Sequence, residues 1–368
     1  MKRIVLLAIF ISLGIWACTD TENGGSDTSF DRGAMLRNYA DNLILPAYED
    51  ALNATQMLNV SLQVFAADQS LQNLKQAQNA WTQAYGTWMY ANAYNFGPAG
   101  EQGFNKSLNE EIATFPVSTI KVENALISGQ FDMNDFNRDA RGFLTLEYLL
   151  FAGIEYSDAE VLQLFVNQPN RKALLTACGE NIESRINGVL QAWQTGYKEI
   201  FTSRQGSDVG SSTSQLYNEF VKSFETNKNI KVELPLGRRP GQTQVAPQLV
   251  EAYYSGKSLE FLKMHLRAIE DIYHGRSKSG ADGIGFREHL DAVVGGPELV
   301  ASTLAQWASV IEALQGVPTS PALSTQIIEN PSALESLREE LQRHTRFFKS
   351  DMSSVLGIAI TFSSGDGD

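Results

Sequence analysis

The chain has 368 residues, enough for about two or three ordinary domains, so it can bury a core without disulfides or a structural metal. Hydrophobic residues make up 43% and charged residues 19% of it, which excludes disordered, collagen-like and coiled-coil proteins. The net charge of −13 repels phosphate backbones over most of the surface, so nucleic acid is not an expected partner.

The N-terminus has the pattern of an export signal. Basic residues at positions 2 and 3 precede an almost wholly apolar run over residues 4–17, which is shorter than the roughly 20 residues of a membrane-spanning helix. Ala17-Cys18 then resembles a bacterial lipobox, which implies cleavage before Cys18 and acylation of Cys18, for example with palmitate. Because Trp16 is bulky for a lipobox, an ordinary signal followed by an incidental cysteine stays open.

The polar residues after the cysteine are typical of a flexible tether, which we expect over residues 18–33. The acidic chain does not attract anionic lipids, so its contact with the membrane depends on the lipid anchor. We expect a location in the cell envelope, at the outer membrane, facing the periplasm or the cell surface. With Cys18 acylated, Cys178 has no partner for a disulfide, and its position on an apolar helical stripe indicates a core residue.

Apolar residues then recur at intervals of three and four along most of the chain, which predicts helix after helix. No alternation typical of β-hairpins or βαβ units interrupts them, so the expected fold class is all-α. The predicted helices cover residues 39–65 around Pro46, 71–88, 175–200, 259–273, 300–314 and 334–355.

A change in composition suggests a domain boundary. Gly, Ser, Thr, Asp and Gln replace the helical pattern between Ser203 and Ser214. We therefore expect two helical-bundle domains, over residues 34–206 and 207–368. Ligand sites in such proteins tend to lie between helices or between domains.

Common catalytic motifs are absent from the sequence. It contains no HExxH, GxSxG or P-loop, no GxGxxG after a strand, and no cysteine pair for zinc. Four histidines are also a small supply for a metalloenzyme.

Residues 135–151 carry the most informative pattern, and we expect them to form one central helix. Its C-terminal half is apolar nearly all round except for Glu147. A buried carboxylate is costly unless it is paired, hydrogen-bonded or protonated. Glu147 is thus either a ligand-binding or metal-binding carboxylate, or half of a structural pair. Gly142 indicates that another helix or a ligand comes close.

Residues 142–151 resemble the GxHxxE segment of the imelysin-like proteins, a bacterial envelope family that includes insulin-cleaving metallopeptidases. Four further segments resemble the family in the same order along the chain. They are Trp81 with the Tyr-Asn-Phe-Gly-Pro of residues 94–98, Phe115-Pro116, Leu-Pro-Leu-Gly at 234–237 with residues 247–258, and the ending from Leu356 to Asp368.

The resemblance implies two all-helical bundles from an old duplication, with the motif at the cleft between them. It also implies iron or haem acquisition, with iron, haem or another metal ion as a possible ligand and iron-uptake components as partners. The motif histidine is replaced by Leu144, and the acidic residue usual before Phe-Gly-Pro by Asn92. The cleft candidates are therefore Gly142, Leu144, Glu147, Asn92 and Arg141, without a catalytic assignment.

Weaker candidates each have an ordinary structural explanation. Glu270 and His274 have the spacing of two metal ligands on one helix face, but an acid–base pair on a solvated helix explains them as well. His344 lies on an apolar stripe, which favours a core histidine. Arg238 and Arg239 form a basic spot in which an anion could dock, or belong to a solvated loop. The aromatic run from Trp81 to Phe96 is more typical of a core than of a ligand platform.

Two classes of function stay open from the sequence. The first is a non-catalytic lipoprotein that binds a ligand or partner at an interdomain cleft, in iron or haem acquisition. The second is a metal-dependent peptidase with a degenerate GxHxxE site, which needs a metal near Glu147. A scaffold whose cleft has lost its function is a third, plainer possibility.

Overall fold

The structure, a computed structural model, describes residues 30–101 and 106–362. The export signal, Cys18 and nearly all of the expected tether lie outside these residues. Within them all regular structure is helical and no β-strand occurs, which confirms the all-α prediction.

The helices fall into a first half and a second half, separated by the loop over residues 204–211. The first half contains α1 (Arg32–Asn38), η1 (Tyr39–Ile44), α2 (Leu45–Ala67), α3 (Leu71–Ala91), η2 (Asn92–Tyr94), η3 (Gly97–Ala99), α4 (Leu108–Ala113), α5 (Thr119–Ser128), η4 (Arg138–Ala140), α6 (Phe143–Phe151), α7 (Asp158–Asn167), α8 (Asn170–Ala192), η5 (Trp193–Tyr197) and α9 (Lys198–Ser203). The second half contains α10 (Ser212–Thr226), η6 (Asn227–Glu233), η7 (Pro247–Leu249), α11 (Ser258–His274), α12 (Phe286–Asp291), α13 (Gly296–Gln315), α14 (Leu323–Glu329), α15 (Ser332–Arg346), η8 (Phe347–Asp351) and α16 (Met352–Leu356).

Local sequence explains where the main helices begin and end. Ser70 caps α3 by accepting a hydrogen bond from the Asn73 N–H, and Ser157 forms a capping box with Glu160 at the start of α7. Pro46 lies in the first turn of α2, directly after the π-helical segment η1. The π-helical segment η1 joins α1 to α2, so the chain runs as one helical rod through the region predicted around Pro46.

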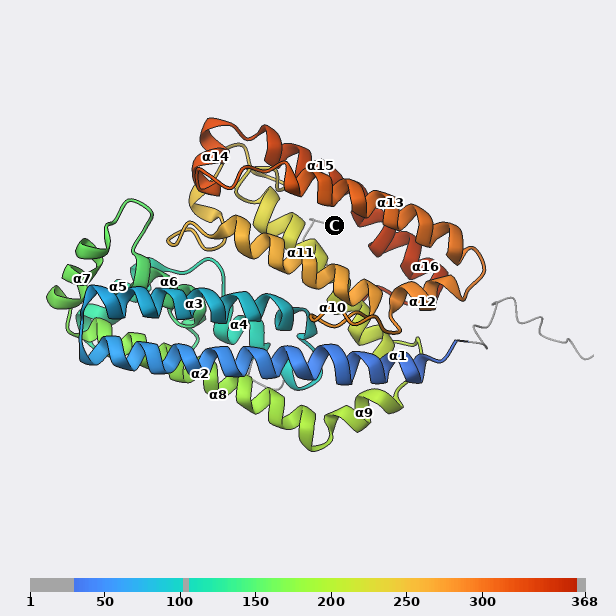
Figure 1. Cartoon of the computed structure of the whole chain (residues 1–368), viewed down its shortest axis with the longest axis horizontal. Coiled ribbons are helices and arrows are strands. Elements are labelled where there is room, and N and C mark those ends of the chain that lie inside the picture. Colours follow the sequence, from blue (N-terminus) through green and yellow to red (C-terminus); the bar gives the residue numbers. More distant parts are fainter. Residues whose placement is uncertain (1–29, 102–105, 363–368) are drawn as a thin grey trace, which may run out of the picture.

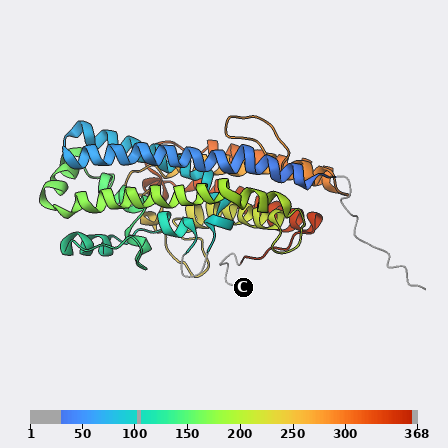
Figure 2. The ribbon, with the colours of Figure 1, turned by 90° about the horizontal axis from the view of Figure 1, so that it is seen from below.

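The first half is built on three long helices. α2 packs against both α3 and α8, and α6 packs between α3 and α8. Figure 2 shows α2 and α8 side by side along the long axis of the molecule. In the second half, α13 packs against α15, and α10 and α12 pack against α11.

The two halves share one continuous hydrophobic core. α11 packs on α3, and α10 packs on η2, so the orange and yellow helices of Figure 1 lie directly on the blue and cyan ones. The Phe261 ring meets the Trp81 and Tyr85 rings edge-on, and Gly86 leaves space for the Met264 sulfur. The loop over residues 204–211 falls at the expected boundary, whereas the division into two domains and the duplication stay predictions.

The prediction of a single helix over residues 135–151 is wrong. Gly142 has φ of +83°, which an L-residue rarely adopts, and the helix α6 begins only after it. Upstream, residues 138–140 form a short 3₁₀ turn, and Phe136 is 83% exposed rather than buried with Phe143. The apolar pattern after Gly142 is therefore helical, but Gly142 keeps the helix from extending upstream of Phe143.

Candidate functional site

The short helix α6 carries the motif glutamate into the core. Its residues are apolar except for Thr145, Glu147 and Tyr148, and Glu147 is only 1% exposed. The Ser255 N–H, from the second half of the chain, donates a 2.7 Å hydrogen bond to Glu147 Oε1. The motif carboxyl group therefore lies where the two halves meet.

The surroundings of Glu147 favour its protonated form. Burial raises the pKa of this carboxyl group from 4.5 to about 8, and the nearby charge of Glu251 adds to the effect. Hydrogen bonds from Ser255 and the Tyr254 backbone oppose the rise without cancelling it. At neutral pH the side chain is therefore mostly a neutral acid, which can donate as well as accept a hydrogen bond.

A tight turn over residues 251–256 covers Glu147. Ala252 in this turn has φ of 54°, in the left-handed region that costs an L-residue about 1–2 kcal/mol. Ala152, which ends α6, has φ of 59°. These are the two non-glycine residues with positive φ among those that the structure describes. One of them thus ends the helix that carries Glu147, and the other lies in the turn that contacts it.

A second carboxylate from the same turn reaches the first half. The Tyr85 hydroxyl of α3 donates a 2.9 Å hydrogen bond to Glu251 Oε1, and Lys231 Nζ lies 2.7 Å from Glu251 Oε2. Lys231, on η6, is 5% exposed, so burial lowers the pKa of its ammonium group while Glu251 opposes that change. The Lys231 ammonium also contacts the Met89 sulfur at 3.3 Å.

Further buried polar side chains lie near Lys231 within the second half. Buried His265 of α11 lies 2.7 Å from the Ser223 hydroxyl of α10 through its Nε2 atom. Burial, aided by the charge of Lys231, lowers the pKa of His265 well below its ordinary value, so the imidazole is neutral. We call the set Glu147, Tyr85, Glu251, Lys231, Ser255, His265 and Ser223 the interface polar cluster.

The donor set around Glu147 does not fit a transition metal. Leu144, at the position of the motif histidine, is 2% exposed and offers no donor atom. No group of three or more His, Cys, Asp or Glu residues within the described ranges could hold a metal ion.

The other cleft candidates lie around the entrance to α6 and the end of α3. A Cβ on Gly142 would lie 2.3 Å from the Ile112 carbonyl oxygen, so α4 makes the close approach there. Asn92 begins η2, directly after α3. Its backbone carbonyl oxygen accepts a 3.0 Å hydrogen bond from the Asn109 side chain. Its own Oδ1 atom is buried without a hydrogen-bond partner among the described residues.

Arg141 belongs to a separate ion-pair network. Its guanidinium lies 2.6 Å from Glu111 Oε2, and Arg138 and Arg185 contact the same carboxylate at 2.7 Å and 3.3 Å. Despite the burial of Glu111, hydrogen bonds from the arginines lower its carboxyl pKa. This network connects α4, α8 and the segment before Gly142, so it positions the start of α6.

The weaker candidates have structural partners. Glu270 forms ion pairs with Arg267 and Arg276, and the half-buried His274 ends α11. Arg238 pairs with Glu335, and Arg239 lies 3.7 Å from Glu233.

Most of the residues predicted to lie in the core are found there, but Tyr90 of the aromatic run is only partly buried. Cys178 is fully buried, and burial raises its thiol pKa to about 12. His344 is fully buried among aromatic rings, as are Trp81 and Trp88 of the aromatic run.

Sequence reasoning did not find Lys231, Glu251 or Ser255 as site residues. Each looks like an ordinary polar residue in the sequence, and only the fold brings residues 85, 147, 231 and 251 together. Residues 247–258 enter the sequence analysis only through the family resemblance. The single signal in the sequence is that Lys231 and Glu233 interrupt an otherwise apolar stretch over residues 230–236.

Comparison with known proteins identifies relatives over most of the chain. The family model of imelysin (peptidase M75) matches residues 44–345. Iron-regulated protein A of Synechococcus elongatus is 21% identical over 327 residues, which cover 84% of each chain.

Two crystal structures share the fold. A protein described as an iron-regulated protein A precursor from Parabacteroides distasonis has a TM-score of 0.71 and 18% identity, covering 88% of this chain and 95% of that one. An imelysin-like protein from Psychrobacter arcticum has a TM-score of 0.70 and 18% identity, covering 90% of this chain and 97% of that one.

Proposed function

Because the chain belongs to the imelysin family, we propose that it is a non-catalytic envelope lipoprotein that binds a ligand or partner between its two halves. We further propose that this binding serves iron or haem acquisition, together with iron-uptake components of the envelope. The names of the Synechococcus and Parabacteroides relatives as iron-regulated proteins support the link to iron.

The observation that carries the proposal is the contact between the motif helix and the second half. Glu147 and Tyr85 come from the first half, and Ser255, Glu251 and Lys231 from the second. Burying so many polar groups is costly unless they are partnered, and a purely apolar interface would avoid that cost. A binding role is one reason for a protein to retain such a cluster.

The buried state of Glu147 limits how a ligand can reach it. Residues 251–256 cover the carboxyl group, so a ligand that contacts it must displace this turn. The left-handed conformation of Ala252 makes the turn costly to hold, which lowers the energy needed to rearrange it. The proposed ligand therefore gains access by movement of residues 251–256.

The proposal assigns no catalysis because the chemistry of a hydrolytic metal site is not assembled. A metallopeptidase needs ligands that hold the metal and leave one coordination position open for water. Here the position of the motif histidine is occupied by Leu144, which has no donor atom, so Glu147 is the one motif side chain that could bind a metal.

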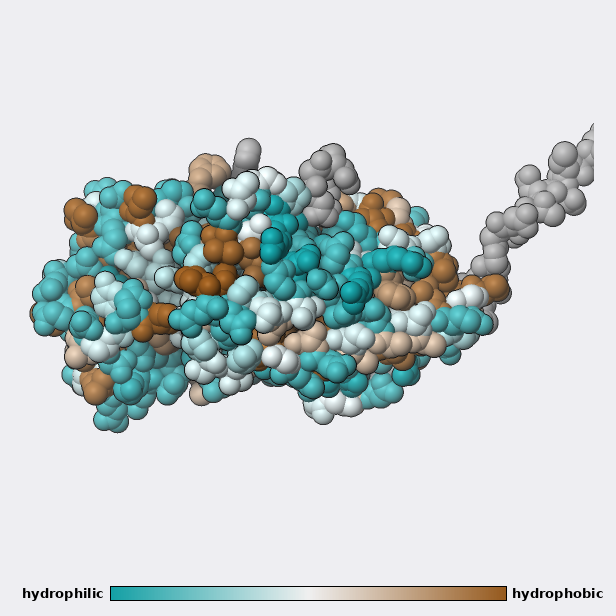
Figure 3. Space-filling view, turned by 90° about the horizontal axis from the view of Figure 1, so that it is seen from above, coloured by the Kyte–Doolittle hydropathy of each residue, from teal (hydrophilic) through white to brown (hydrophobic). Residues whose placement is uncertain are grey.

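The proposed location follows from the N-terminal residues. Residues 1–17 would be removed during export, and acylated Cys18 would hold the protein at the outer membrane. No helix in the part of the chain that the structure describes is long and apolar enough to cross a bilayer. The face shown in Figure 3 is mainly hydrophilic, with apolar side chains in small separate patches. Attachment through a lipid fits such a surface.

Titration of the purified protein with haemin and with ferric citrate, followed by a peptidase assay, tests the proposal. We expect saturable binding of at least one of the two ligands and no cleavage of unfolded peptides. Cleavage that a chelator abolishes would instead favour the metal-dependent peptidase. Absence of binding to both ligands would remove the proposed role in iron or haem acquisition.

A further inference from the structure

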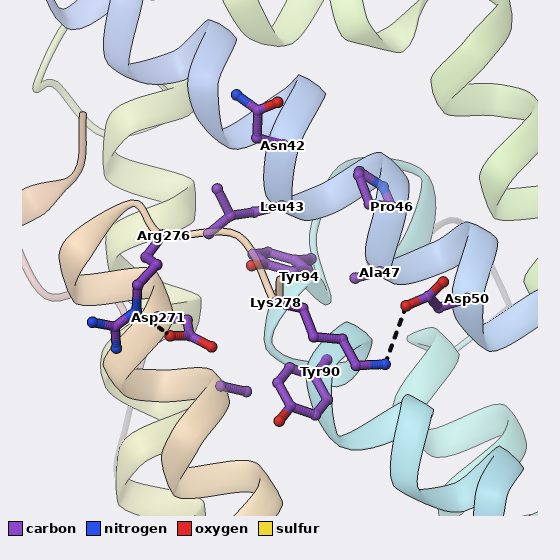
Figure 4. Close-up of a pocket in the computed structure, with 11 residues that line it drawn as sticks. Asn42, Leu43, Pro46, Ala47, Asp50, Tyr90, Tyr94, Asp271, Arg276 and Lys278 are labelled. Atoms are coloured by element: carbon purple, nitrogen blue, oxygen red, sulfur yellow. Dashed lines mark hydrogen bonds and ion pairs between the residues drawn. The ribbon is translucent and has the colours of Figure 1, made fainter. Parts of the chain in front are cut away.

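A second site between the halves lies at the end of α11, apart from the interface polar cluster. There the chain leaves α11 at Gly275 and returns at Gly285 to begin α12. The loop between these glycines projects over α2 and α3, and Figure 4 shows its Lys278 side chain reaching toward Asp50.

The neck of this loop is closed by backbone contacts. A Cβ on Gly275 would lie 2.6 Å from the Gly285 nitrogen, and one on Gly285 would lie 2.2 Å from the Gly275 nitrogen. Asn38 of α1 donates hydrogen bonds to the Gly275 and Ile284 carbonyl oxygens at 2.8 Å and 2.9 Å. The loop is therefore a compact Ω-loop with an anchored base, a form that is frequently functional.

Its tip is held by one side chain. Lys278 Nζ lies 3.1 Å from Asp50 Oδ2 and 5.0 Å from the centre of the Tyr90 ring. An exposed ion pair and an exposed cation–π contact each contribute little to stability. Lys278 and Asp50 are 45% and 50% exposed, so the tip is held weakly while the base is held firmly.

The lysine occupies a groove built from both halves. Leu43, Pro46, Tyr90 and Tyr94 from the first half, with Ala268 from the second, line a pocket of about 30 Å³ beside it. That volume holds only about one or two water molecules. A ligand that enters this pocket would therefore have to displace the Lys278 side chain, which lines both the pocket and the adjoining hollow.

Beyond Lys278 the groove widens into a second hollow of about 610 Å³, which shares Asn42, Pro46, Asp50 and Lys278 with the first. Its acidic lining residues are Asp50 and Asp282. Deeper in the groove, Asp271 is already paired with Arg276 at 2.8 Å. Without the lysine ammonium, the larger hollow is lined by the carboxylates of Asp50 and Asp282, and Asp50 also lines the smaller pocket together with Tyr90.

We propose that this groove binds alkylammonium groups of free amines, and that Lys278 occupies it as an internal competitor. Such a ligand would resemble the lysine side chain that it replaces. Its alkyl chain would lie along Leu43, Tyr90 and Tyr94, and its ammonium group would lie between Asp50 and the face of the Tyr90 ring. The larger hollow accepts the remainder of an amine longer than the lysine side chain. This inference does not depend on the proposed role in iron or haem acquisition.

The test is calorimetric titration of the full-length protein with n-pentylamine, which reproduces the stem and charge of lysine. The wild type, Lys278→Ala and Lys278→Met are compared, with 1-pentanol as the uncharged ligand. Lys278→Ala empties the groove, whereas Lys278→Met keeps a stem in it and removes only the charge. We expect Lys278→Ala to bind n-pentylamine at least tenfold more tightly than the wild type, and Lys278→Met to gain much less.

Adding Asp50→Asn to Lys278→Ala should abolish the increase in affinity for n-pentylamine. The affinity for 1-pentanol should not increase in any variant. Equal binding by wild type and Lys278→Ala would overturn the proposal. So would a gain that survives Asp50→Asn, that appears equally in Lys278→Met, or that appears with 1-pentanol. Because Lys278 and Asp50 are exposed, these variants should fold, and a thermal melt of each checks this.

Discussion

Glu147 combines deep burial with hydrogen bonds from Ser255 and the Tyr254 backbone, in the other half of the chain. The pKa of its carboxyl group is about 8 in the folded protein and 4.5 for an unperturbed glutamate. Between these pH values the folded protein therefore holds a proton that the unfolded chain has lost. Stability from this residue is therefore complete below pH 4.5 and is lost as the pH rises toward 8.

Glu147→Gln should make the protein more stable at alkaline pH. Glutamine is uncharged, and its Oε1 atom can still accept the hydrogen bond from the Ser255 N–H. We expect little difference from the wild type near pH 4.5 and a gain of about 2–4 kcal/mol near pH 8. Urea unfolding at both pH values measures it. A variant that is less stable than the wild type at pH 8 would mean that the ionised form has a partner.

His344 has the opposite pH dependence. It is fully buried against Phe348, Trp307 and Phe224, and neither ring nitrogen has a hydrogen-bond partner among the described residues. Burial lowers its pKa from 6.5 to about 3, so the folded protein excludes a proton that the unfolded chain binds. Stability is therefore lost as the pH falls below 6.5.

His344→Leu removes both the titration and the unsatisfied nitrogens. We expect its stability advantage over the wild type to grow by about 1 kcal/mol for each pH unit between 6.5 and 4.5. Urea unfolding across this range is the measurement. A difference that does not change with pH would show that His344 is protonated, or solvated, in the folded state.

At the scale of elements, the position of α6 depends on what precedes it. Gly142 turns the chain with positive φ against the Ile112 carbonyl, and Arg141 anchors the same stretch to Glu111. The two features direct the helix that carries Glu147 toward the second half. The ends of α6 are thus specified by contacts outside the helix itself.

Gly142→Ala should be strongly destabilising, with Gly188→Ala as its control. The new Cβ at residue 142 meets backbone at 2.3 Å and forces an unfavourable φ, so we expect a loss above about 2 kcal/mol. Gly188 lies inside α8 with nothing within 4 Å of a built Cβ, so alanine there should gain about 0.5–1 kcal/mol. Thermal melts compare the two. A tolerated Gly142→Ala would show that α6 can begin earlier.

Helical periodicity identified most long elements because they bury one face for many turns. The helices predicted at 71–88, 259–273 and 300–314 appear as α3, α11 and α13. The pattern failed at residues 135–142, where apolar residues at helical spacing precede a glycine whose conformation no periodicity reveals. It also could not find the interface polar cluster, because contacts between residues 85, 147, 231 and 251 depend on tertiary packing.

At the scale of the whole molecule, the two halves act as one packed unit. The hydrophobic core runs through both, and the polar cluster and the lysine-filled groove both lie between them. Binding at either place should therefore stabilise the association of the halves as well as the fold.

Membrane attachment is predicted to depend on one residue outside the described structure. Cys18→Ser should abolish acylation, so the protein should become soluble or remain unprocessed while its fold is unchanged. Fractionation of cells followed by mass spectrometry of the intact protein measures this. Unchanged membrane partition and unchanged mass would contradict a lipid anchor at Cys18.

The central claim is that Glu147 serves binding between the halves, and a matched pair of variants tests it most directly. Haemin and ferric citrate are titrated into the wild type, Glu147→Leu and Glu270→Leu. The first variant removes the hydrogen-bonding atoms of Glu147, and the second changes a glutamate that pairs with Arg267 and Arg276. We predict that Glu147→Leu weakens the binding of the ligand that the wild type holds by at least tenfold, and that Glu270→Leu changes it less than twofold. Equal affinities for wild type and Glu147→Leu, or an equal loss in both variants, would contradict the account.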